Sequence, residues 1–470
     1  MQKNKCLTFG LILAGCGYSG VVNAETLQEA LASAYLNNPT LEAQRAHLRS
    51  VDEQVPQALA NWRPSIKLSG DAVRSNTFAK SPSLVETPSG VAEIYGSGTT
   101  LATSTDASIS VQQPLYRGGR TVAQTEQAEA QVLAARADLA NTEQTVLFNV
   151  VTAYMNVVQY QAVRALSINN EQVLQRQLDA TNDRFRVGEV TRTDVSQAES
   201  RLSGAHADRT QAEGNLRAAV ANYVNVVGHA PVNLAQPAPL GGLPATIADA
   251  QAAAVVENPS LASAQHSYEA AEHGIDLVAG ELLPTVTLSG QALRNYEYEG
   301  PQTFERIYQA GVNVTIPLYQ QGQEYARLRA QKQAAGQART DVDVARRDLE
   351  EQVTKAWEGL ETARARKLSY RDQITAAEVA LEGVQRESQV GSRTVLDVLN
   401  AEQELLTARV NLVEAEHDEV MAAYQVKATI GQLSAQALGL SVPLYDPVKH
   451  YDEVRDKWIG IGSGPSDGHE

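Results

Sequence analysis

RFRVGEVTRTDV (residues 184–195) and ESQVGSRTVLDV (residues 387–398) decide the fold, because one pattern occurs twice in the same chain. In each copy a Val-Gly pair is followed by a Thr-x-x-Asp sequence. Glycine adopts the left-handed conformation that ends a helix at little cost, and Thr-x-x-Asp forms a capping box at the start of the next helix. Each copy therefore predicts a turn between two helices, in which Asp194 and Asp397 cap free backbone N–H groups.

The duplication extends far beyond these turns. Residues 114–228 align with 317–431 without a gap over 115 positions, at an offset of 203. Upstream the offset is 220, since Asn38-Pro39 recurs as Asn258-Pro259. One inserted residue rotates every later side chain of a helix by about 100°, whereas loops tolerate insertion. We therefore predict rigid helices in the gapless part and an exposed polar loop at 77–103, which would contain the 17 extra residues of the first copy.

Two long runs without proline follow the Pro-Leu-Tyr sequences of the two copies. They predict helices at about 119–187 and 322–390, each spanning roughly 100 Å. Return helices are expected at about 191–228 and 394–431. These carry small and large apolar residues at alternating spacings of three and four, which is typical of a coiled-coil seam. In the first copy this seam is interrupted only by Arg209.

The segments before Pro-Leu-Tyr alternate between apolar and polar residues. This period of two predicts β-hairpins at about 64–114 and 284–317. Ile66 and Leu68, for example, share one face, and the residues between them are polar. Four strands of roughly ten residues with one apolar face are typical of transmembrane β-barrels, although soluble half-buried hairpins have the same pattern. Four strands cannot close in lipid, whereas three copies would supply twelve, so the strand count favours an oligomer.

The N-terminus has the features of a secretory signal over residues 1–24. Two lysines precede a short apolar run, and small residues mark a cleavage site after Ala24. Leu13-Ala14-Gly15-Cys16 also resembles a lipobox, which would make Cys16 the acylated first residue, and the sequence leaves both possibilities open. No later run is long and apolar enough for a transmembrane helix.

Composition argues against several functional classes. The net charge of −16 argues against a nucleic-acid partner, which needs a basic surface. The eight histidines are scattered, both cysteines lie in the leader, and the chain contains no phosphate-binding loop or nucleophile elbow. We therefore expect no enzymatic activity, no metal site and no cofactor.

These observations give the expected organisation of the chain. A signal peptide (1–24) precedes a first structural repeat (25–244), which ends in a Pro/Gly-rich linker at 229–244. A second repeat (245–433) follows. Residues 434–470 form a C-terminal periplasmic segment, with a disordered Gly/Ser-rich end from Gly460 to Glu470.

Several of these motifs together resemble the TolC family of outer-membrane efflux and secretion channels, over nearly the whole chain after the leader. The turn sequences quoted above are the most specific part of the resemblance. Ile316-Pro317-Leu318-Tyr319 through Gly322 is similar to the family's strand-to-helix junction. The segment Val442-Pro443-Leu444-Tyr445-Asp446-Pro447 through Asp456-Lys457-Trp458 is similar to the type I secretion branch.

The resemblance implies an α+β membrane protein of the Gram-negative outer membrane that extends through the periplasm. Each protomer would give four strands and long coiled-coil helices, and a homotrimer would form a 12-stranded β-barrel continued by an α-helical tunnel. The implied partners are outer-membrane lipid, a periplasmic membrane-fusion adaptor and an inner-membrane ABC or RND pump. Type I protein secretion is favoured, with small-molecule efflux as an alternative and a non-channel coiled-coil surface protein as an alternative of another class.

The resemblance also assigns roles at the two turns, which would be periplasmic tips that close the tunnel. Asp397 matches an aspartate of a constriction ring, and Asn400 stands where the family has the second aspartate. Asp194 and Arg393, with Thr193, match the ties that hold neighbouring helix pairs closed. Ser388 stands where the family has a tyrosine at the gate, which puts that hydrogen bond in doubt. The turns themselves comprise Val187, Gly188, Val390 and Gly391.

Overall fold

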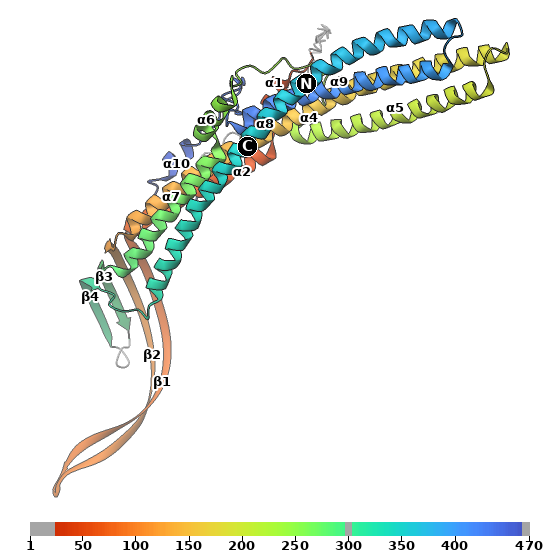
Figure 1. Ribbon diagram of the computed structural model, residues 1–470. Helices are drawn as coiled ribbons and strands as arrows, with labels where there is room; N and C mark the ends of the chain where they lie inside the picture. The colour runs from red at the N-terminus through yellow and green to blue at the C-terminus, as the bar shows by residue number, and fades with distance from the viewer. Residues whose placement is uncertain (1–23, 297–302, 463–470) are drawn as a thin grey trace, which may run out of the picture. The chain divides into compact units, whose positions relative to one another are not determined.

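The computed structural model describes residues 24–296 and 303–462 of the 470-residue chain (Figure 1). The predicted leader, apart from its last residue, and the predicted disordered end from residue 463 onward lie outside the described residues. No helix in the described part is long and apolar enough to cross a membrane.

The chain forms two compact units, and each contains segments from both repeats. The turn unit comprises Met1–Asn37, Asn149–Gly241 and Ala363–Met421; the sheet unit comprises Asn38–Phe148, Gly242–Thr362 and Ala422–Glu470. The division therefore cuts across the duplication.

The sheet unit contains one four-stranded antiparallel sheet in the order β1-β2-β3-β4. The strands are β1 (Ser65–Thr87), β2 (Gly90–Arg117), β3 (Thr285–Tyr296) and β4 (Phe304–Thr315). The first hairpin supplies β1 and β2 and the second supplies β3 and β4, and the β2–β3 pairing joins the two copies. The outer edges of β1 and β4 are left without a neighbouring strand among the described residues.

The expected exposed loop at 77–103 is wrong. β1 and β2 continue through it, paired residue by residue until Thr87 meets Gly90, so these strands have 23 and 28 residues and not about ten. The segment is rich in Ser and Thr, but it also contains Val, Ile, Leu and Tyr, and threonine, β-branched and aromatic residues favour strands. The hydroxyl side chains of this segment suggest a loop. Pairing of β1 with β2, however, gives the backbone N–H and C=O groups of both runs hydrogen-bond partners.

Short helices precede each hairpin. Asn38 and Asn258 each accept a backbone N–H at a helix start that has proline at its first position. One apolar cluster joins Ala254, Leu261, Val353 and other buried side chains of the second copy. These helices are α1 (Leu27–Asn37), α2 (Pro39–Asp52), α3 (Gln54–Leu59), α6 (Ile247–Glu257) and α7 (Pro259–Ala279), with 3₁₀ turns at Ala60–Trp62 and Gly280–Leu282; one more short helix, α10 (Lys449–Val454), lies near the C-terminus.

Four long helices contain most of the remaining residues. They are α4 (Arg120–Arg186), α5 (Arg192–Val227), α8 (Gln323–Gln389) and α9 (Val395–Thr429). α4 and α8 have 67 residues each, which corresponds to roughly 100 Å of helix. Both pass from the sheet unit into the turn unit, where α5 and the first 27 residues of α9 lie.

The C-terminal segment packs within the sheet unit. The buried carboxylate of Asp52 in α2 lies 3.0 Å from Nδ1 of His450, and burial raises the pKa of Asp52, although His450 opposes the shift. Glu129 of α4 accepts from Tyr451 and Arg455. These contacts fix α10 against two helices of the first copy.

Candidate functional site at the helical turns

The α4–α5 turn has the geometry expected for a glycine-capped helix end. Gly188 has a φ of +82°. Its N–H donates to the carbonyl of Phe185, and the N–H of Glu189 donates to that of Arg184. This is a Schellman motif, which satisfies carbonyls that the end of a helix leaves free.

The α8–α9 turn repeats the same bonds 203 residues later. Gly391 has a φ of +80°, and its N–H donates to the carbonyl of Ser388. The N–H of Ser392 donates to the carbonyl of Glu387. The two copies therefore share backbone geometry at the turn, although only the glycine is common to them between residues 188–190 and 391–393.

Both aspartates cap the helices that follow. Asp194 accepts from the backbone N–H of Thr191 at 2.8 Å and from its hydroxyl at 2.7 Å, and the hydroxyl of Thr191 accepts from the N–H of Asp194. Asp397 and Thr394 make the same three bonds. These bonds favour the ionised form, so the pKa of each aspartate lies below its ordinary value.

The predicted tie residues Asp194 and Arg393 each contact a different partner in the structure. Arg393 donates from Nε to Glu387 at 2.8 Å, and the nearby carboxylate of Asp397 adds to the raised pKa of the guanidinium. Asp194 bonds to Thr191. Within the described chain, therefore, Asp194 and Arg393 each have a partner of their own and do not pair with each other.

Asn400 is engaged in a contact that the sequence did not suggest. Its Oδ1 accepts from a guanidinium N–H of Arg201 in α5 at 2.8 Å, which links the two helical hairpins of the turn unit. Asp397 and Asn400 are one turn apart on α9 and so lie on one side of the helix. Ser388 is buried, with 7% of its surface exposed, in place of the expected tyrosine.

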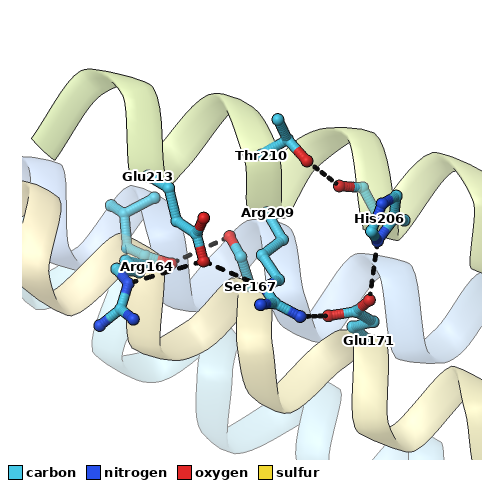
Figure 2. Close-up of polar contacts among 8 residues, drawn as sticks. Arg164, Ser167, Glu171, His206, Arg209, Thr210 and Glu213 are labelled. Atoms are coloured by element: carbon cyan, nitrogen blue, oxygen red, sulfur yellow. Dashed lines mark hydrogen bonds and ion pairs between the residues drawn. The ribbon is translucent and has the colours of Figure 1, made fainter. Parts of the chain in front are cut away.

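A charged cluster joins α4 to α5, and sequence reasoning missed it (Figure 2). Glu171 of α4 accepts from Arg209 at 2.8 Å and lies 3.0 Å from Nδ1 of His206. Arg209 also donates to Glu213, which lies 3.9 Å from Arg164. The bond from Arg209, and then the one from His206, lowers the pKa of Glu171. We call these five residues the α4–α5 clasp.

A signal for the clasp was present in the sequence. His206, Arg209 and Glu213 follow one another at spacings of three and four, so they share one face of α5. Arg209 interrupts an apolar seam, and a seam predicts apolar partners, not a carboxylate. The carboxylate that explains it, Glu171, lies 38 residues away on another helix.

The second hairpin is joined differently. Arg371 donates to Glu416 at 3.1 Å, and Arg366 donates to Asp418 at 3.1 Å. Position 412, which corresponds to Arg209, is leucine. The two copies therefore share the turn geometry and differ in the charges that hold each hairpin together.

No group of three or more His, Cys, Asp or Glu side chains in residues 24–296 and 303–462 is arranged to hold a metal ion. The site consists of two capped turns, the charged side chains around them and the helices that carry them. Its chemistry is that of ion pairs and hydrogen bonds.

The fold is that of outer-membrane channels. A solved structure described as the outer-membrane channel OprN matches with a TM-score of 0.74, covering 86% of this chain and 89% of that chain at 20% identity. The chain belongs to the family of outer membrane efflux proteins, whose family model matches residues 30–229 and 252–432.

Two curated relatives illustrate the range of the family. The outer membrane efflux protein BepC of Brucella suis is 36% identical over 96% of this chain and 95% of its own length. The alkaline protease secretion protein AprF of Pseudomonas aeruginosa is 26% identical over 71% of each chain. The resemblance to TolC-type channels is confirmed, as is the location in the outer membrane with extension into the periplasm.

Proposed function

We propose that the protein is the passive exit duct of a tripartite export system that carries out type I protein secretion. A periplasmic adaptor and an inner-membrane pump of the ABC or RND class would deliver cargo and energy. Family membership supports export, and similarity to a relative named for protease secretion supports protein cargo. The similarity of residues 442–458 in the C-terminal segment to the type I secretion branch supports it further.

Small-molecule efflux is the second candidate. It is favoured by BepC, which is named an efflux protein and matches over nearly the whole of both chains. One duct can serve either role, because the pump and the adaptor select the cargo.

The open edges of the sheet support a homotrimer. Among the residues that the structure describes, the outer edges of β1 and β4 have no paired strand, and unpaired backbone groups are costly in lipid. We propose that β4 of one copy pairs with β1 of the next, so that three copies close a sheet of twelve strands. Each protomer would then contribute its two helical hairpins to a common periplasmic duct.

We infer that the two turns form the gate of this duct. Asp397 and Asn400 would face the constriction, and Asp194, Thr193 and Arg393 would form ties to a neighbouring protomer. Arg393 supports this role because its side chain is about half exposed and its contact with Glu387 is local and exchangeable. Surface ion pairs are worth up to about 1 kcal/mol each, so a ring of them can bias a closed state and still yield to an adaptor.

Gene deletion with measurement of both cargo classes tests the function. Loss of a secreted protein with unchanged susceptibility to drugs and detergents would support type I secretion. Increased susceptibility with normal secretion would favour efflux. If neither changed, and the purified protein gave no conductance in planar bilayers, the duct itself would be refuted.

Single-channel recording of Arg393→Ala tests the gate. We expect higher conductance than in the wild type, because removing the guanidinium weakens the closed turns. Arg386→Ala is a matched control: it also removes a charge near the turn, but Arg386 pairs with Glu382 on its own helix. Equal conductance in both variants and the wild type would contradict the gate assignment.

A further inference from the structure

One face of the sheet is apolar and exposed over most of its length. Rows of paired residues place Ile66 beside Val111 and Leu68 beside Ile109, and in the second hairpin Leu288 lies beside Val312. Their exposed fractions range from 36% to 75%. In an outer-membrane protein such a face contacts lipid.

Two arginines interrupt this face in a single row. The register pairs Arg294 of β3 with Arg306 of β4, and Ala107 and Gly70 continue the row across β2 and β1. Directly paired like charges repel one another, since the strands are only about 4.8 Å apart. Gly70 and Ala107 have small, uncharged side chains, so the rest of the row supplies no counter-charge to the two guanidinium groups.

Neither guanidinium has an ion-pair partner within the described chain. Arg294 lies over the ring of Tyr296 at 4.5 Å, and Arg306 lies over the ring of Phe304 at 5.4 Å. The neighbouring residues Asn295 and Glu305 point to the other face, because side chains alternate along a strand. The pair is therefore held by aromatic rings on the apolar face, with its charge uncompensated.

The row lies at the end of the apolar face that is distant from the helices. β3 begins at Thr285, next to the 3₁₀ turn that follows α7, and Arg294 lies nine residues further on (Figure 1). Nine residues correspond to about 30 Å of strand, close to the thickness of a bilayer's hydrocarbon core. Exposed aromatic residues mark both ends: Trp62, Tyr116 and Tyr319 near the helices, and Tyr296, Phe304 and Tyr308 around the arginines.

We propose that Arg294 and Arg306 form a binding site for the phosphate groups of outer-leaflet lipid. The helices belong to the periplasm, so the opposite end of the apolar face meets the outer leaflet. Two guanidinium groups on neighbouring strands can share the oxygens of one phosphate, which removes their mutual repulsion. The aromatic rings on either side of this row, Tyr308 on the side of the helices and Tyr296 and Phe304 on the other, contact the lipid at the boundary between head groups and chains.

Lipid binding by purified protein tests the site. Native mass spectrometry would compare lipid A carrying two phosphates with its dephosphorylated form, for the wild type and for Arg294→Gln/Arg306→Gln. A basic residue near a charged membrane surface contributes about 1 kcal/mol, so losing both should weaken binding of the phosphorylated lipid about thirtyfold. The dephosphorylated form should bind both proteins equally.

Two further variants keep the test decisive. Lys67→Gln removes one charge from the opposite, polar face of the sheet and should leave lipid binding unchanged. Arg294→Lys/Arg306→Lys retains both charges and should restore most of the affinity, which excludes misfolding as the cause of a loss. Equal binding by the Gln variant and the wild type would overturn the proposal, as would full competition by millimolar inorganic phosphate, which would indicate a free-anion site.

The proposal does not depend on the cargo. A variant that loses lipid binding while export continues in cells would support the lipid site and leave the proposed function standing.

Discussion

Glycine at the two turns is required by backbone conformation and not by space. A Cβ at Gly188 or Gly391 would meet no atom within 4 Å, yet both residues have φ near +80°. Residues other than glycine adopt this region at a cost of about 1–2 kcal/mol. The same residue type is thus needed at both turns although the surrounding side chains differ.

Gly391→Ala should therefore destabilise the α8–α9 turn by about 1–2 kcal/mol. Hydrogen exchange across residues 387–397 should become faster, by roughly five- to thirtyfold. Gly383→Ala is the matched control, because Gly383 lies within α8 with open space around it. Alanine there should stabilise the helix by up to about 1 kcal/mol. Slower exchange at the turn in Gly391→Ala would show that the left-handed conformation is not what the glycine provides.

The turn residues were the most predictable part of the site. Val-Gly and Thr-x-x-Asp are local motifs, so the caps made by Asp194 and Asp397 follow from a few neighbouring residues. The bonds of Asn400 to Arg201 and of Glu171 to Arg209 depend on how distant helices meet. Spacing along one helix cannot identify such partners.

At the scale of elements, the α4–α5 clasp distinguishes the first helical hairpin from the second. Arg209 contacts two carboxylates on two different helices, Glu171 and Glu213. The second copy has leucine at the equivalent position, so an apolar seam continues there.

Arg209→Leu, which copies Leu412 of the second hairpin, should loosen the clasp. Glu171 would lose its strongest donor, so its pKa should rise from its lowered value toward the ordinary one. Hydrogen exchange in α4 around residue 171 and in α5 around residue 209 should increase. Arg217→Leu is the control for adding leucine to α5, because Arg217 is an exposed residue outside the clasp. Faster exchange in both variants would indicate an effect of helix propensity and not the loss of the clasp.

The C-terminal segment is a second element whose attachment can be tested. His450→Ala would leave the buried carboxylate of Asp52 without its hydrogen-bond partner, at a cost of about 1–3 kcal/mol. Limited proteolysis should then release the segment after residue 434 more rapidly than in the wild type. His450→Ala/Asp52→Asn should recover part of the loss, because the double variant has no buried charge; no recovery would mean that packing of the ring dominates.

At the scale of the whole molecule, the two units should respond differently to acid. In the turn unit, the pKa values of Asp194, Asp397 and Glu171 are lowered, so their stabilisation is present above the unfolded pKa and is lost as pH falls through the folded one. In the sheet unit, burial raises the pKa values of Asp52 and Glu143, so their protonation as pH falls removes the free-energy cost of a buried charge.

Hydrogen exchange between pH 7 and pH 3, corrected for its intrinsic pH dependence, should show this contrast. Protection at residues 188–197 and 391–400 should fall below about pH 4, while protection around Asp52 should hold or increase down to the unfolded pKa. Uniform loss of protection in both units would show that the capping carboxylates do not control the turns.

The duplication in the sequence was enough to predict much of the architecture of the whole molecule. Gapless alignment over 115 residues requires elements that cannot accept an insertion, and α4, α5, α8 and α9 lie in that part. The length of β1 and β2 was not accessible, because Ser- and Thr-rich runs such as residues 96–104 resemble loops until their partner strand is known. The two compact units were missed as well, since their contacts join segments far apart in the chain.

The unequal hairpins have a practical consequence. β2 pairs with β3 only from Thr105 onward, so residues 90–104 pair with β1 alone and form a two-stranded ribbon that ends at Pro88 and Ser89. The ribbon extends beyond the arginine row, on the side away from the helices (Figure 1). A short peptide inserted between Pro88 and Ser89 would interrupt no ladder pairing. The ribbon is therefore a ready carrier for presenting foreign epitopes on the cell surface, with the channel below it left intact.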